Sequence, residues 1–265
     1  MRRMSEDVDF KVVPINKEQV SGSRLRKELG ELRKNITENL VAAGFQIDPK
    51  DKSQVRSRNG NHYTIYQLPY STAAESKDML RPTIQIELTH ARLREPSIKL
   101  PVTSFVAEAF GRPAELAAID CVSVTETAAE KIVALTRRTA MERAGLSRDP
   151  DPTIVRHIYD LHLIRNKIDV STATALARSI ALQDAEEFRN QYPAYQNDIV
   201  GETYKALEAL RSDPAIRERY SSFVAAMVYG DPVGFSTAIK TTISLVEATW
   251  PLFQQRPTGP RLGLF

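Results

Sequence analysis

Two aspartates near the start of the chain have a spacing that suits a metal-binding strand. The chain begins MRRMSEDVDF, and in residues 7–12 three apolar side chains alternate with Asp7, Asp9 and Lys11. Alternation with a period of two predicts a strand that has one buried face. Residues two apart on a strand point the same way, with Cα atoms about 6.5–7 Å apart. Carboxylates at this spacing can share a divalent cation or hold two, although an isolated D-x-D is more often a solvated strand face.

A third carboxylate has an equivalent position on the segment TIQIELTH. Ile84, Ile86 and Leu88 fall on one face of this predicted strand, whereas Glu87 lies in the middle of the other face. If this strand neighbours residues 7–12, three carboxylates converge. Each pair at ~7 Å then repels by about 2.4 kcal/mol at a dielectric of ~20, but by only about 0.6 kcal/mol in water. Whether a cation is needed therefore depends on how far the face is covered, which the sequence leaves open.

A basic stripe follows in the segment AAEKIVALTRR. Lys131 and Arg138 are seven residues apart, which places them about 20° from alignment on a helix, while Ile132 and Leu135 face inward. Such a stripe is either a phosphate-binding surface or an ordinary solvated helix face.

The segment RHIYDLHLIRN adds one more acidic candidate, Asp160. Its simplest interpretation is an ion pair with Arg156, one helical turn earlier. His157 and His162 lie close by, but no H-x-x-x-H pair exists, so a histidine metal site is disfavoured. No order of Ser, His and Asp stands out that would favour a hydrolase triad.

The remaining pattern divides the chain into two parts. A helix is predicted from Ser23 to Ala43, Asn59-Gly60 predicts a hairpin turn, and short strands at SIKLPV and AIDCV are expected to complete a mixed sheet. After residue 123 the pattern becomes helical, with a helix at about 125–143, another at RHIYDLHLIRN and three or four more up to about residue 248. We therefore predict an α/β domain at residues 1–122 and a helical domain at 123–265.

Composition narrows the class of protein. The chain has 265 residues, 36 Lys and Arg against 33 Asp and Glu, and one cysteine, Cys121. A single cysteine excludes an internal disulfide framework and suits a reducing compartment. No apolar run approaches the roughly 20 residues of a membrane span, and no apolar signal segment is present. We expect a soluble cytoplasmic protein without a membrane partner.

Four segments together resemble a known family. RMSEDVDF, close to the family pattern R-F-S-E-D-I-D-L, is followed by RPTIQIELTH, ETAAEKIVALTRR and RHIYDLHL, in the family's order and across about the first 165 residues. They resemble the AbiEii/AbiGii-type nucleotidyltransferase toxins of abortive-infection and toxin–antitoxin systems, which belong to the polymerase-β-like superfamily. The resemblance implies an α+β fold, in which a mixed-sheet nucleotidyltransferase domain precedes an all-helical domain that carries Lys131 and Asp160.

The resemblance also implies an enzyme and assigns roles to its residues. A nucleoside monophosphate would pass from an NTP to an acceptor hydroxyl, of RNA or tRNA, while pyrophosphate leaves. Asp7 and Asp9 would hold Mg²⁺, and Glu87 would be the third metal-binding carboxylate. Lys131 would lie against the phosphates, Asp160 would orient Lys131 or the nucleotide, and Ser5 would lie near the incoming phosphates. Two further candidates for phosphate or RNA contacts are Arg138 and Arg156. The expected partner is a cognate antitoxin.

One family feature has no counterpart in this sequence. A Gly-Gly-Ser/Thr turn that binds the triphosphate precedes the R-x-S-E-D motif in the family, yet only Met1 and Arg2 precede the motif here, and the chain contains no Gly-Gly. The expectation is therefore either an upstream start or a truncated copy. Two alternatives to an active enzyme follow: an inactive copy that binds only antitoxin or RNA, and a metal-dependent phosphohydrolase.

Overall fold

A computed structural model describes the chain except for residues 1–2, 6, 16–21, 71–82, 148–150 and 252–265. The described part forms two compact units. The sheet unit comprises Arg2–Leu93 together with Ala226–Gly230, and the helical unit comprises Arg94–Ala225 and Asp231–Phe265, with Met1. The sheet unit takes in the residues around Met227 because the backbone N–H of Met4 donates to the Met227 carbonyl (2.8 Å).

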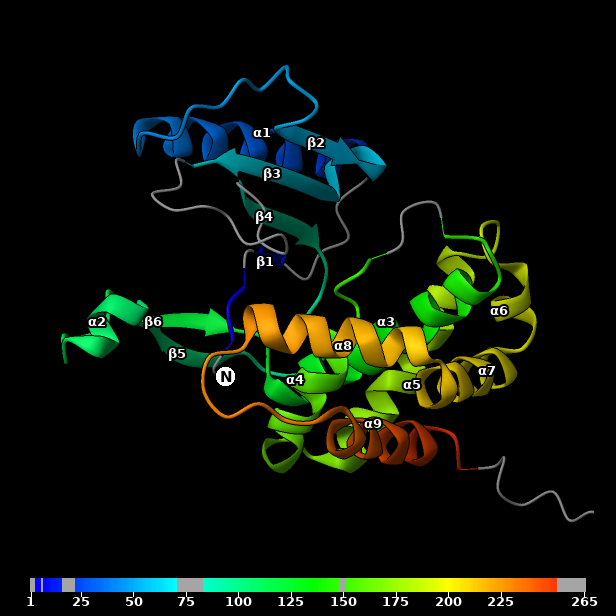
Figure 1. Ribbon diagram of the computed structural model, residues 1–265. Helices are drawn as coiled ribbons and strands as arrows, with labels where there is room; N and C mark the ends of the chain where they lie inside the picture. Colours follow the sequence, from blue (N-terminus) through cyan, green and yellow to red (C-terminus); the bar gives the residue numbers. More distant parts are fainter. Residues whose placement is uncertain (1–2, 6, 16–21, 71–82, 148–150, 252–265) are drawn as a thin grey trace, which may run out of the picture. The chain divides into compact units, whose positions relative to one another are not determined.

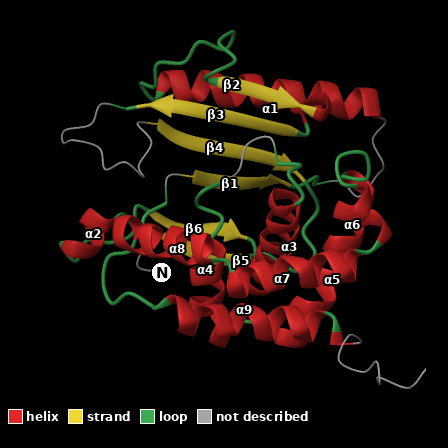
Figure 2. Cartoon of the chain, turned by 45° about the vertical axis from the view of Figure 1, so that its right-hand side comes forward, coloured by secondary structure: helices red, strands yellow, loops and turns green. Residues whose placement is uncertain are grey.

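The sheet unit contains a four-stranded mixed sheet in the order β1-β4-β3-β2 (Figures 1 and 2). The strands are β1 (Asp7–Val12), β2 (Val55–Arg58), β3 (Tyr63–Pro69) and β4 (Thr83–His90). β1 runs parallel to β4, whereas the β4–β3 and β3–β2 pairs are antiparallel. The predicted strands at residues 7–12 and at TIQIELTH are therefore confirmed as elements, and they are neighbours.

Helix α1 (Gly22–Ala42) covers the apolar face of this sheet (Figure 2). Its bounds agree with the helix predicted at 23–43. Ile36 and Leu40 of α1 pack against a core whose buried members come from the strands: Val55, Tyr66, Leu68 and Leu88. The period-two pattern of β2, β3 and β4 thus turns one row of side chains toward the core under the helix and leaves the other row for the opposite face, whereas Val8 and Phe10 of β1 stay exposed (45% and 41%).

The predicted hairpin turn is tight and left-handed. A single 3₁₀ turn, Asn59–Asn61, joins β2 to β3, and Asn59, Gly60 and Asn61 all have positive φ (49°, 62° and 73°). Asparagine and glycine tolerate this conformation best. The Asn61 side chain also donates to the Arg26 carbonyl of α1 (3.1 Å), so the turn is tied to the helix as well as to its strands.

The expectation that SIKLPV and AIDCV complete the mixed sheet is wrong. These segments form β5 (Ile98–Val102) and β6 (Leu116–Cys121), which pair only with each other in a separate antiparallel sheet joined through α2 (Phe105–Ala109). They belong to the helical unit. Strand periodicity identifies a strand but not its partner, and these two strands are close enough in sequence to pair with each other.

The helical unit is built around α3 (Val124–Arg143). The helices that follow it are α4 (Arg156–Ile164), α5 (Val170–Glu187), α6 (Pro193–Asn197), α7 (Ile199–Ser212), α8 (Pro214–Met227) and α9 (Phe235–Thr249). Two side chains fix the start of α3: Ser123 caps the helix, and the fully buried Glu126 accepts hydrogen bonds from the backbone N–H groups of Arg94 and Glu95 (3.0 and 2.9 Å). Many side chains of α3 are themselves buried: Ala128, Ala129, Ile132, Val133, Leu135, Thr136, Arg137, Thr139 and Ala140.

The helices predicted at 125–143 and at RHIYDLHLIRN are confirmed, and the mixed α/β architecture agrees with the expected fold class. The division at residue 122 stays a prediction; the compact units themselves part at Leu93. Within the described part of the chain, no helix has the length and apolar character that crossing a membrane requires.

Tyr66 gives a test of the packing between sheet and helix. Its ring is fully buried, and its hydroxyl donates to the Arg33 carbonyl (2.9 Å) and lies 3.0 Å from the Thr37 hydroxyl of α1. We expect Tyr66→Phe to lower the free energy of unfolding of the sheet unit by about 1 kcal/mol and Tyr66→Ala by about 3–5 kcal/mol. Urea denaturation measures both, with Ile15→Ala, at a fully solvated position (98% exposed), as a control that changes stability by less than about 0.5 kcal/mol. Equal losses in all three variants would contradict this packing.

Candidate functional site

The register of β1 against β4 brings the predicted carboxylates together on one face. Asp9 is paired with Glu87, and Asp7 with Gln85. Since adjacent strands lie about 4.8 Å apart and paired residues point to the same side, Asp7, Asp9 and Glu87 share the face that α1 does not cover. Asp9 is exposed, whereas Asp7 and Glu87 are half-buried. The mutual repulsion of these carboxylates is therefore nearer to the value in water than to that in a dry interior.

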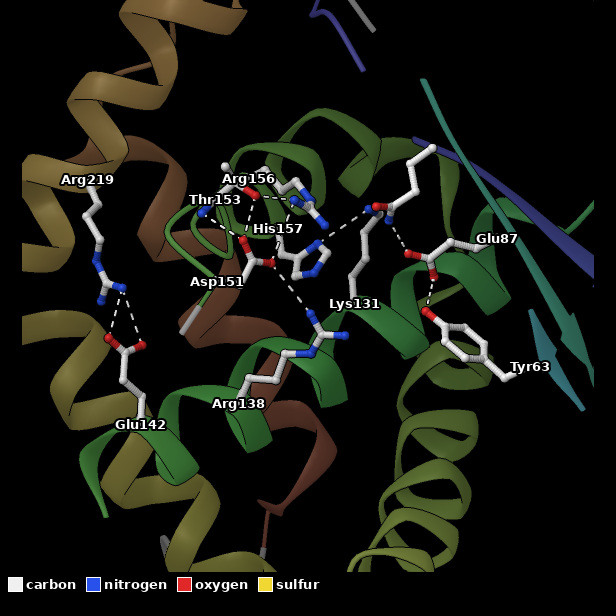
Figure 3. A network of polar contacts seen from close by, with 11 residues as sticks. Tyr63, Glu87, Lys131, Arg138, Glu142, Asp151, Thr153, Arg156, His157 and Arg219 are labelled. Carbon is white, nitrogen blue, oxygen red and sulfur yellow. Dashed lines mark hydrogen bonds and ion pairs between the residues drawn. The ribbon is translucent and has the colours of Figure 1, made fainter. Parts of the chain in front are cut away.

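Glu87 is held by two neighbours on the same face. Its Oε2 accepts a hydrogen bond from the Tyr63 hydroxyl of β3 (2.8 Å), and its Oε1 accepts one from the Gln85 side-chain amide (2.5 Å) (Figure 3). Burial, the hydrogen bond to Glu87 and the charges of Glu87 and Asp9 raise the pKa of Tyr63, so the phenol stays a proton donor throughout the physiological range. The carboxylate of Glu87 thus has a fixed orientation.

Ser5, the motif serine, precedes β1. Its hydroxyl donates to the carbonyl of Asp7 (3.3 Å), and the side chain is exposed. Glu6 of the same motif lies outside the described residues. This local contact positions the entry to β1 but leaves the role of Ser5 in phosphate binding a prediction.

The described residues contain no group of three His, Cys, Asp or Glu side chains that could hold a metal ion by themselves. This finding does not conflict with a donor set on the sheet, because Mg²⁺ in nucleotide enzymes is bound by one or two carboxylates, with waters and substrate phosphates completing its shell. Asp7 and Asp9 supply carboxylates of this kind.

In the helical unit, Lys131 and Asp160 form an ion pair between α3 and α4. The Lys131 Nζ donates to Asp160 Oδ2 (2.9 Å) and lies 3.5 Å from His157 Nδ1. The Asp160 side chain is fully buried, and that of Lys131 is 17% exposed. The simple expectation that Asp160 pairs with Arg156 on its own helix is wrong, because the packing of α4 on α3 offers the buried carboxylate a closer cation.

Arg138 and Arg156 are joined by a carboxylate that the sequence did not single out, Asp151. Its Oδ2 lies 3.5 Å from Arg138 and 3.7 Å from Arg156, and its Oδ1 accepts hydrogen bonds from the Thr153 backbone N–H and hydroxyl (2.8 and 2.7 Å) (Figure 3). Arg138 is half exposed (50%), as expected for the stripe that it was predicted to form with Lys131 on the α3 surface. The Arg156 side chain is less open, at 26% exposed.

The structure therefore assembles the predicted residues into two groups. Asp7, Asp9 and Glu87 gather on the sheet; a second group in the helical unit contains Lys131, Asp160, Arg138 and Arg156. Sequence reasoning missed Tyr63, Gln85 and Asp151. The alternation of TIQIELTH already put Gln85 on the face of Glu87, but the positions of the other two depend on strand register and loop geometry, which leave no local signal.

Comparison with protein families identifies a matching family. The family model described as "Nucleotidyl transferase AbiEii toxin, Type IV TA system" matches residues 1–242. Searches of curated proteins and of solved structures found no match.

The ion pair between Lys131 and Asp160 yields a prediction about stability. Breaking a buried pair leaves an uncompensated charge and typically costs 3–5 kcal/mol, and because Lys131 is partly exposed we expect about 3 kcal/mol for Asp160→Ala. Lys131→Met should cost a similar amount, whereas the double variant Lys131→Met/Asp160→Ala should lose less than the sum of the two. Thermal or urea unfolding of the four proteins gives the coupling energy. Strictly additive losses would show that the two side chains do not interact.

Proposed function

The chain belongs to the AbiEii family of nucleotidyl transferase toxins of type IV toxin–antitoxin systems, and we propose that it transfers a nucleoside monophosphate from an NTP to a hydroxyl of an RNA acceptor. In this reaction the acceptor oxygen forms a bond to the α-phosphorus, the bond from that phosphorus to the bridging oxygen breaks, and pyrophosphate leaves. The observation that carries the proposal is the β1–β4 register, which places Asp9 beside Glu87.

The sheet carboxylates suit this chemistry. Asp7 and Asp9 offer two carboxylates on one strand face, and Glu87 adds a third whose orientation is set by Tyr63 and Gln85. When bound there, Mg²⁺ would offset the triphosphate charge and favour the deprotonated acceptor oxygen. We assign metal binding to Asp7, Asp9 and Glu87, and Glu87 also accepts the acceptor proton.

The cations of the helical unit suit the phosphates. Asp160 holds the Lys131 ammonium in one position, so the charge is in place before pyrophosphate departs. Asp151 similarly restrains Arg138 and Arg156, whose planar guanidinium groups match phosphate geometry. We assign phosphate contacts to Lys131, Arg138, Arg156 and Ser5, and the orientation of Lys131 to Asp160.

Membership in a toxin–antitoxin family implies an antitoxin as partner. The antitoxin, the NTP and the RNA acceptor together define the assay that tests the proposal: the 265-residue chain, labelled NTP, Mg²⁺ and total RNA, with and without the antitoxin.

Replacing the strand aspartates tests the metal site. We expect Asp7→Asn and Asp9→Asn each to reduce incorporation of labelled nucleotide into RNA by more than about a hundredfold, since even groups that only support a metal ligand are worth 10–100-fold. Glu31→Gln, which neutralises an exposed carboxylate on α1, should leave the rate unchanged. Full activity of Asp7→Asn would overturn the assignment. Phosphate release without labelled RNA would instead indicate a phosphohydrolase, and RNA or antitoxin binding without any turnover would indicate a binding module.

The hydroxyl of Tyr63 gives a finer test of the same site. Tyr63→Phe removes the hydrogen bond that orients Glu87, so the Mg²⁺ concentration for half-maximal activity should rise by about 10–100-fold, with activity partly restored at high Mg²⁺. Tyr66→Phe is the matched control, since it deletes a hydroxyl from the same strand on the opposite face. An unchanged Mg²⁺ dependence in Tyr63→Phe would show that Glu87 needs no such support.

A further inference from the structure

Two arginines on β2 face the same side of the sheet as the carboxylates. Arg56 is paired with Ile65 and Arg58 with Tyr63, and β3 is in turn paired so that Ile65 lies opposite Glu87. Paired residues share a face, so both arginine side chains project beside Tyr63, on the face that carries Glu87. Both are exposed, and among the residues that the structure describes neither guanidinium forms an ion pair.

Tyr63 lies between the acidic and the basic parts of this face. Its hydroxyl donates to Glu87 Oε2 (2.8 Å), and on the other side Tyr63 is paired with Arg58 of β2. On this face β1 and β4 carry Asp7, Asp9 and Glu87 together with Lys11, whereas β2, about three strand spacings of 4.8 Å from β1, carries only the two arginines as charged groups.

The two arginines would offset the repulsion between the sheet carboxylates and a polyanionic substrate. A row of carboxylates repels an RNA strand unless positive charge lies close by. Arg56 and Arg58, two residues apart on one strand, are about 6.8 Å apart at their Cα atoms, so each side chain can reach a different phosphate. Guanidinium groups bind phosphate in a two-pronged geometry, and contacts of this kind hold a nucleic acid in register without reading its sequence.

We propose that Arg56 and Arg58 bind two phosphates of the acceptor RNA strand and hold its reactive end beside the carboxylates of β1 and β4. The identity of the acceptor rests on the proposed function, but the binding itself does not require turnover. The triphosphate of the NTP is the other source of phosphate that could occupy these arginines, and the experiment separates the two.

The test is the salt dependence of RNA binding by the unaltered chain and by Arg56→Gln/Arg58→Gln. Affinity for a fluorescent single-stranded oligoribonucleotide is measured by anisotropy between 50 and 200 mM salt, without NTP or Mg²⁺. Each phosphate contact to a single strand contributes a slope of about −0.7 in log K against log salt. The double variant should therefore have a slope shallower by about 1.4, so that its affinity falls about sevenfold less over this range.

The matched control is Lys27→Gln/Lys34→Gln, which removes the same net charge from exposed sites on α1, on the other side of the sheet. Its slope should equal that of the unaltered chain. Three results would overturn the proposal: an unchanged slope in the arginine variant, an equal change in the lysine control, or no RNA binding by the unaltered chain. A matching loss of NTP affinity, measured by titration calorimetry with Mg²⁺, would assign the arginines to the triphosphate and overturn it as well. None of these readouts depends on nucleotide transfer, so an inactive chain leaves the test intact.

Discussion

The pairing of β1 with β4 is the constraint on which the sheet unit depends. A shift of one residue in this register would move Asp7 and Asp9 to the face that carries the apolar core and would turn Val12 away from it. Val12 packs against the buried core of Val55, Tyr66, Leu68 and Leu88, and Ile36 and Leu40 of α1 pack against the same core, so this burial favours the observed register. Packing that excludes water on one side of the sheet thus determines the chemistry on the other side.

The helical unit also holds charged side chains in fixed positions, but it does so with ion pairs between segments. α3 is so fully enclosed that its surface is confined to a narrow stripe, and this stripe carries Lys131 and Arg138. Each cation is restrained by an acidic partner from another segment, Asp160 from α4 and Asp151 from the preceding loop. Ion pairs of this kind stabilise little by themselves, but they reduce the number of positions that a long flexible side chain adopts. The acidic partners therefore restrain where the two positive charges lie, and they add no positive charge.

Much of this architecture follows from local sequence pattern. The strands at β1 and β4, helix α1, the Asn59-Gly60 turn and helices α3 and α4 could be predicted because alternation, helical spacing and turn residues act over a few positions. Pairings between distant segments could not be predicted in this way. The strands that begin at Ile98 and Leu116 were expected in the mixed sheet, yet they pair with each other. Asp160 forms its ion pair with Lys131 on another helix. The contact of Tyr63 with Glu87 likewise depends on the β3–β4 register, which no single segment encodes.

The parallel pairing of β1 and β4 also has a consequence for when the protein acquires its acidic face. Asp9 and Glu87 are 78 positions apart, so the amino-terminal strand leaves the ribosome long before its neighbour has been synthesised. The hairpin of β2 and β3 closes over a few residues, whereas β1 must wait for a long loop to close. The acidic cluster is thus among the last features of the sheet to form. A nascent chain carries the separate parts of the site without its assembled geometry.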